Sequence, residues 1–99
     1  MSKVVEATHR VPDGKTVRVC VQLDPSGIIE NVVFTGDFFL EPADLIDQLA
    51  EQLHHVTLQE AEERIRQFFE QQQPIFMFGV RPEDFVIVLR KAVLEEKAS

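Results

Sequence analysis

The chain has 99 residues, of which 44% are hydrophobic and 27% are charged, and it contains only four glycines and five prolines. This composition excludes disordered, collagen-like and low-complexity proteins, and the length suits one small domain over residues 1–99. A formal net charge of -7 disfavours nucleic acids and anionic membranes as partners. No stretch has the apolar length of a membrane span or of a signal peptide. Because its lone Cys20 cannot form an internal disulfide, the sequence favours a cytoplasmic protein.

The first predicted elements form a β-hairpin. Residues 1–9 are expected to be flexible or strand-like. Residues 15–23 alternate strictly between apolar and polar side chains, which is typical of a half-buried strand. A turn with proline and glycine at 24–27 leads into a second β-rich run over 28–35. In that run the apolar spacing lengthens to three residues around Glu30, which predicts a β-bulge.

Three helices are expected after the hairpin. A proline at the first helical position and leucines at helical spacing predict a helix over 42–54. Thr57 and Glu60 have the spacing of a capping box, so a second helix begins there and is stopped by Pro74. A third helix opens at Pro82, where acidic residues follow in the first turn.

The apolar run 74–80 is too short for a helix and contains Gly79, so it is a short strand or a packed loop, and we favour the strand. Strands followed by helices predict an α+β domain, in which a small antiparallel sheet (the hairpin plus a possible short third strand) packs against about three helices. The side chains expected in the core are Val17, Val19, Val21, Leu23, Ile29, Val32, Phe34, Leu45, Ile46, Leu49, Leu53, Leu58, Ala61, Ile65, Phe68, Phe69, Phe85, Val86, Leu89, Ala92 and Val93.

Signatures of catalysis and of metal binding are missing. The sequence has no nucleophile elbow, no phosphate-binding loop and no cysteine pair. His54 and His55 are adjacent and would point about 100 degrees apart on a helix, which favours solvated helix-end histidines over metal ligands. The acids between Glu41 and Glu63 lie along two helices, and a solvated face explains them better than a cation site. We therefore expect no catalytic residue in this chain and no metal site.

A turn and a thiol near the first predicted strand are candidates for binding or chemistry. Gly14 and Lys15 lie at the strand entrance with Arg18 nearby, and such a turn could approach a phosphate or a partner's carboxylate, although an ordinary turn explains it as well. Cys20 lies on the polar face between Arg18 and Gln22. A reactive thiol is one interpretation, and a small residue on a partly covered face is the plainer one.

Residues 35–39 form the second candidate segment. A strand ends there in Gly36 and Asp37, which are followed by Phe38 and Phe39. Adjacent side chains in an extended segment point to opposite sides, so both rings cannot enter the same core face. We expect one of the two phenylalanines to dock onto a partner protein.

Three segments together resemble the C-terminal accessory domain of lipoate-protein ligase. They are RVPDGKTVRV (10–19), TGDFF (35–39) followed by EPADLIDQLAEQL, and GVRPEDFVIVL (79–89). The resemblance covers nearly the whole chain in the right order and spacing, and the combination is specific although each motif alone is weak. One departure is Arg81, which stands where family members often carry a capping Ser or Thr.

The resemblance implies an α+β accessory subunit that carries none of the reacting groups. In that family the large catalytic domain binds lipoate and ATP, makes lipoyl-adenylate and passes the lipoyl group to a lysine of a carrier domain. In some organisms the small domain is a separate polypeptide that the catalytic chain needs for adenylation, and this chain is similar to that arrangement. The expected heterodimer uses ATP, Mg and lipoate, this chain alone binds no cofactor, and it meets lipoyl carriers only indirectly.

The resemblance also implies which residues contact the partner chain or the adenylate. The matched positions are Gly14, Lys15, Arg18, Gly36, Asp37, Phe38 and Phe39. Lys15 is the most functional of them, because a positioned ammonium can contact either the adenylate phosphate or the catalytic chain. Two alternatives stay open at this point: a standalone module that recognises lipoyl carrier domains, and a thiol or sulfur-handling protein that uses Cys20.

Overall fold

The computed structural model describes residues 2–12, 14–72 and 76–98, so Asp13 of the predicted turn and the helix-stopping Pro74 lie outside the described residues. In chain order the elements are β1 (Lys3–Arg10), β2 (Thr16–Leu23), β3 (Ile29–Gly36), β4 (Phe39–Glu41), α1 (Leu45–Glu51), α2 (Leu58–Gln72), β5 (Phe76–Phe78) and α3 (Pro82–Ala98). The predicted α+β class is confirmed. No helix in this part of the chain has the length and apolarity needed to cross a bilayer.

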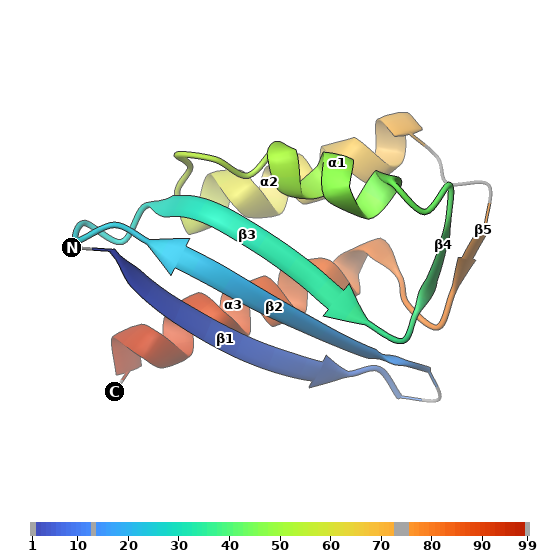
Figure 1. Ribbon diagram of the computed structural model, residues 1–99, viewed down its shortest axis with the longest axis horizontal. Coiled ribbons are helices and arrows are strands. Elements are labelled where there is room, and N and C mark those ends of the chain that lie inside the picture. Colours follow the sequence, from blue (N-terminus) through green and yellow to red (C-terminus); the bar gives the residue numbers. More distant parts are fainter. Residues whose placement is uncertain (1, 13, 73–75, 99) are drawn as a thin grey trace.

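The main sheet is antiparallel with the order β1-β2-β3 (Figure 1). The N-terminal segment forms β1, which pairs with β2 along its whole length, from Lys3 opposite Leu23 to Arg10 opposite Thr16. On β2 the valines face the helices and are completely buried, whereas the alternating polar residues face away from them. The predicted half-buried strand is therefore confirmed, and the sheet has one covered face and one open face.

The predicted hairpin turn and bulge are both present. Gly27 adopts a φ of 87°, and its N–H donates to the Asp24 carbonyl at 2.9 Å. Along the following strand the register shifts, because Gln22 pairs with Asn31 but the next residue of β2 pairs with Ile29. Glu30 is thus the extra residue, and the bulge allows apolar side chains three residues apart to face the same core.

The helices cover one face of the main sheet. α3 packs against β1 and β2, α1 lies against β3, and α2 packs against α3 (Figure 1). Phe85 of α3 is completely buried, and its ring contacts Phe34 edge-on at 5.2 Å, Phe38 edge-on at 5.4 Å and Phe69 in a stack at 5.5 Å between centroids. The predicted core is confirmed except that Ile46 and Leu58 are only half-buried. Buried rings of this kind each contribute about 1.5–3 kcal/mol to folding.

The second sheet is a feature that the sequence analysis did not predict. The expected short strand within 74–80 exists as β5, but it pairs with β4 in a separate two-stranded ribbon, with Phe39 opposite Phe78 and Leu40 opposite Met77. It does not extend the hairpin sheet, whose third strand is β1 instead. A three-residue strand such as β4 is too short to show a period, which is why the sequence pattern missed it.

The first helix is shorter than the predicted 42–54. Pro42, which follows a cis peptide bond, lies in a bend, and the first helical residue is Leu45. The Pro42 carbonyl instead accepts the N–H of Leu45 at 3.1 Å, where α1 begins. The helix cannot start earlier because the residues just before Pro42 are paired in β4, and the chain must turn before it can coil.

The capping box at the start of α2 is confirmed. The N–H of Glu60 donates to the Thr57 hydroxyl at 3.2 Å, and the N–H of Thr57 donates to the Glu60 carboxylate at 3.1 Å. Hydrogen bonds from the backbone N–H and the hydroxyl of Thr57 hold the pKa of Glu60 below its ordinary value. The box therefore satisfies N–H groups at the helix start that have no partner within the helix.

Two arginine–glutamate pairs join α2 to α3. The guanidinium of Arg90 donates to Glu62 at 2.6 Å, and that of Arg66 donates to both carboxylate oxygens of Glu83 at 2.8 and 3.2 Å. The hydrogen bonds from Arg66 lower the pKa of Glu83. Glu62 is also buried, so the interpretation of the acidic stretch as a solvated face is wrong for this residue. Its carboxylate is instead part of the contact between the two helices.

Candidate functional site

The three segments that carry the family resemblance meet at one end of the molecule. The N–H of Lys15 donates to the Gly79 carbonyl at 2.9 Å, and the N–H of Thr16 donates to the Asp37 carboxylate at 2.7 Å. The turn before β2 therefore contacts both the segment after β3 and the segment after β5. Figure 1 shows the β1–β2 connection and the β4–β5 ribbon at this same end.

The glycines at this end allow backbones to approach each other closely. A Cβ on Gly14 would lie 2.7 Å from the Gly79 carbonyl oxygen, and a Cβ on Gly36 would overlap the Thr16 carbonyl oxygen. Both side chains are excluded by backbone atoms, which cannot rotate away. The N–H of Gly14 donates to the Val11 carbonyl at 2.9 Å, so the N–H groups of Gly14 and Lys15 are both engaged. These two N–H groups are therefore not free to bind a ligand or partner, whereas the Lys15 side chain extends away from the turn.

The Lys15 side chain crosses Gly79 and ends beside an aromatic ring. Gly79 adopts a φ of 82°, and a Cβ at this position would collide with Lys15 Cγ. The ammonium nitrogen lies 5.9 Å from the centroid of the Phe78 ring. A cation over a ring at an exposed site is stabilised by about 0.5–1 kcal/mol. The lysine singled out by the sequence is therefore held at the edge of the β4–β5 ribbon.

Arg18 lies apart from the junction at which Lys15, Asp37 and Gly79 meet. Its guanidinium donates to the Glu6 carboxylate at 2.9 Å across the β1–β2 pair, and the two side chains are 56% and 51% exposed. Arg18 is on the open face of the main sheet, as is Cys20, which is a free, half-buried cysteine. A surface pair of this kind contributes little to stability. The structure does not join Arg18 to the hydrogen bonds that link the three segments.

The two adjacent phenylalanines point in opposite directions, as predicted. Phe38 is half-buried and meets the Phe85 ring edge-on, whereas the Phe39 side chain is 64% exposed. The inward ring anchors the segment after β3 to the core, and the outward ring is available to another molecule. Docking of Phe39 onto a partner stays a prediction.

Phe39 belongs to an aromatic ribbon that the sequence analysis did not recognise. We use this name for the outward face of β4 and β5, formed by Phe39, Phe76 and Phe78. Phe76 and Phe78 are 53% and 51% exposed, and their rings stack with centroids 6.2 Å apart. Leu40 and Met77 point to the other side, toward the core. The strand favoured over 74–80 could have revealed this face, because alternation along a strand places Phe76 and Phe78 on the same side.

A shallow hollow adjoins the aromatic ribbon. Its volume is about 340 Å³, and its lining includes Phe38, Phe39 and Ile46, so it lies where β3, β4 and α1 meet. The ring of Phe39 borders the hollow while also belonging to the ribbon. The apolar surface at this end is therefore larger than the ribbon alone.

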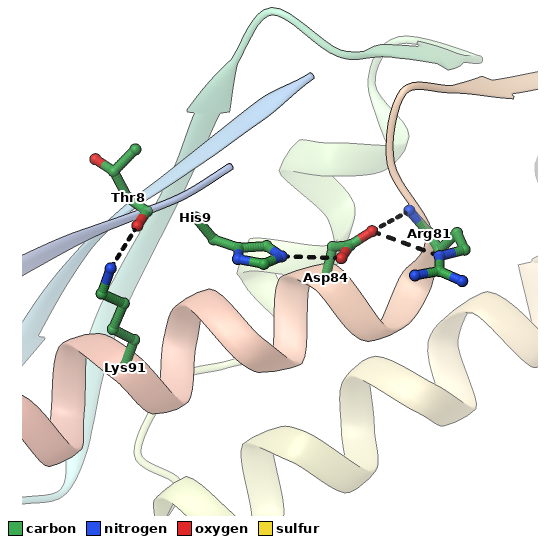
Figure 2. A network of polar contacts seen from close by, with 5 residues as sticks. All are labelled: Thr8, His9, Arg81, Asp84 and Lys91. Atoms are coloured by element: carbon green, nitrogen blue, oxygen red, sulfur yellow. Dashed lines mark hydrogen bonds and ion pairs between the residues drawn. The ribbon is translucent and has the colours of Figure 1, made fainter. Parts of the chain in front are cut away.

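The third segment positions the start of α3 through a buried carboxylate (Figure 2). Asp84 is 1% exposed, accepts the N–H of Arg81 at 2.8 Å and lies 3.0 Å from His9 Nε2. Asp84, three residues after Arg81, thus makes the returning half of a capping box, while position 81 supplies no side-chain acceptor to the first turn. Two turns further along α3, Lys91 donates to the Thr8 carbonyl at 3.0 Å. These contacts tie β1 to α3, and His9 was not singled out from the sequence.

The histidines and acids of the described residues form no metal-binding cluster of three or more groups. His54 and His55 are exposed but lie beyond the end of α1, not on it as predicted. His54 Nδ1 is 2.9 Å from the Glu30 carbonyl, a contact with the backbone of β3.

The features that distinguish this small α+β domain are a backbone junction, a lysine and exposed aromatic rings. Together they define a domain suited to binding another protein.

Comparison with known proteins identifies the family. No family model matches the chain. Lipoate-protein ligase A subunit 2 of Thermoplasma acidophilum is 35% identical over 74 residues, which span 75% of this chain and 76% of that protein. A solved chain from the bi-partite lipoate protein ligase and E2 lipoyl domain of the same archaeon matches with a TM-score of 0.77 and 30% identity, over 91% of this chain and 98% of that chain. The chain therefore belongs to the family of lipoate-protein ligase A second subunits, and the resemblance is confirmed.

Proposed function

We propose that this chain is the non-catalytic accessory subunit of a two-chain lipoate-protein ligase. In this role the catalytic partner chain needs it to form lipoyl-adenylate from ATP and lipoate, before the lipoyl group passes to a lysine of a carrier domain. The observation that carries the proposal is the agreement of sequence and fold with the second subunit of a bi-partite ligase. ATP, Mg and lipoate then belong to the assembled ligase, and lipoyl carriers meet this chain only indirectly.

The physical role of such a subunit is to complete a site held on another chain. A mixed anhydride such as lipoyl-adenylate is hydrolysed readily by water, so closing the site protects it. The junction of Gly14, Lys15 and Gly79 supports this role. The N–H groups of Gly14 and Lys15 are engaged within the chain, whereas the Lys15 ammonium lies at the edge of the ribbon, where it can reach another molecule. Lys15 contacts the partner chain or the adenylate phosphate in this proposal, where a cation stabilises developing negative charge.

The direct test is release of pyrophosphate that depends on ATP and lipoate. A catalytic chain from the same organism is assayed with and without this protein, together with Lys15→Ala, Arg18→Ala and Cys20→Ser. Pyrophosphate release is expected only with the small chain, and it should survive Cys20→Ser. Lys15→Ala should lower the rate more than Arg18→Ala, because Arg18 is already paired with Glu6.

Two outcomes would count against the proposal. If the matched catalytic chain releases pyrophosphate equally well alone, the small chain is not required for adenylation. If Cys20→Ser abolishes the stimulation while the protein stays folded, the stimulation depends on the thiol, which contradicts an accessory role that does not use Cys20.

A further inference from the structure

The exposed phenylalanines of this chain are all gathered in one place. Five of the eight phenylalanines are buried or half-buried, and the remaining three form the aromatic ribbon. Phenylalanine, like tyrosine and tryptophan, is enriched at protein–protein interfaces relative to the rest of the surface. The hollow beside Phe39 extends the apolar surface, so a partner would meet both a projecting face and a depression.

The charged side chains near the aromatic ribbon differ in sign between its two ends. Lys15 lies over Phe78 at one end, and three residues after Phe78 the chain reaches Arg81, whose side chain is 78% exposed and lies 3.9 Å from the Asp84 carboxylate. At the other end Glu41 is paired with Phe76 in the register of the two strands. The ribbon therefore runs from a cation to a carboxylate. A partner segment with apolar side chains and a carboxylate near Phe78 would match it.

From this surface we infer that the aromatic ribbon is where the catalytic chain of the ligase docks. The inference rests on the proposed function and identifies the surface through which that function acts. The occupant is the catalytic chain because the relatives of this protein are second subunits of a bi-partite ligase, so their working state has a protein partner. A second copy of this chain is disfavoured as the occupant, since each copy carries a net charge of -7.

The test measures binding of the purified catalytic chain by isothermal titration calorimetry. Phe39→Ser and Phe78→Ser remove ribbon rings, and Lys15→Glu reverses the cation. Val33→Ser is the matched control, because Val33 is 56% exposed but lies on the open face of the main sheet. Each ring variant should raise Kd by about ten-fold or more, as expected for anchor residues, while the control changes Kd by less than about two-fold. Lys15→Glu should raise Kd and weaken its dependence on salt.

Thermal melts of every variant establish that it is folded before its binding is compared. If folded Phe39→Ser and Phe78→Ser bind and stimulate the catalytic chain as the wild type does, the docking inference is wrong and the proposed function stands. If they abolish only self-association of the isolated chain, the ribbon is a contact between copies, which also overturns the inference. If the wild type itself neither binds nor stimulates its matched catalytic chain, the proposed function fails first.

Discussion

The main sheet and the aromatic ribbon use apolar side chains in opposite ways. The valines of β2 are 0% exposed beneath α3, and the Phe85 ring is enclosed by three other rings. The three ribbon phenylalanines are instead more than half exposed. Burial of an apolar side chain stabilises the folded protein, so the same substitution should lower the free energy of unfolding more in the main sheet than in the ribbon. The difference separates the part of the chain that maintains the fold from the part that is free to bind.

The largest expected effect tests this separation with one substitution in each region. Phe85→Ala should lower the free energy of unfolding by about 3–5 kcal/mol, because a large buried ring is replaced by a cavity. Phe39→Ala should change it by less than about 0.5 kcal/mol. Urea unfolding followed by circular dichroism measures both, since the chain has no tryptophan or tyrosine for fluorescence. Phe85→Leu serves if the alanine variant does not fold. Equal losses at Phe85 and Phe39 would mean that the ribbon belongs to the core.

An intermediate effect is expected at the polar contacts that hold each region in place. Asp84→Ala should cost about 1–3 kcal/mol, because it removes a helix cap and leaves the His9 ring without its carboxylate. Asp37→Ala, which removes an exposed carboxylate from the Thr16 N–H, should cost no more than about 1 kcal/mol. Urea midpoints compare the two variants. If Asp37→Ala lowered the urea midpoint more than Asp84→Ala, the Asp37–Thr16 contact would stabilise the fold more than the contacts of Asp84 do.

The smallest expected effect is a pH dependence at the exposed start of α2, away from the aromatic ribbon. The pKa of Glu60 is lower in the folded state because of its hydrogen bonds with Thr57. Its contribution to stability is therefore complete above about pH 4.3, the ordinary value for glutamate, and is lost as the pH falls through the lowered value. Glu60→Gln should reduce the urea midpoint at pH 7 but not at pH 2.5. Glu70→Gln, which changes an exposed acid on the same helix, is the control. If Glu60→Gln reduced the urea midpoint equally at both pH values, the effect would not come from ionisation of Glu60.

The sequence predicted those elements whose residues carry a repeating pattern. The strict alternation from Thr16 to Leu23 identified β2, the irregular spacing at Glu30 identified the bulge, and Thr57 with Glu60 identified the start of α2. Each of these signals lies within a few residues of chain, where one local rule applies. The same kind of signal showed that Phe38 and Phe39 must point to opposite sides.

The features that escaped prediction depend on contacts between distant residues. His9 and Asp84 are 75 positions apart, and nothing in either local sequence shows that they meet. β4 has only three residues, and its identity as a strand comes from pairing with β5 across two helices. The candidate site follows the same division. Gly14, Lys15 and Asp37 were singled out locally, whereas their junction with Gly79 required the fold.

The hydrogen bond from the Lys15 N–H to the Gly79 carbonyl has a use in spectroscopy. It is a backbone contact between the turn before β2 and the segment after β5, so its lifetime reports how firmly the ribbon end is held to the rest of the chain. The exchange of this amide hydrogen with deuterium can be followed by nuclear magnetic resonance in the free chain and in the assembled ligase. Slower exchange in the complex would show that assembly with the catalytic chain reduces the opening of this junction.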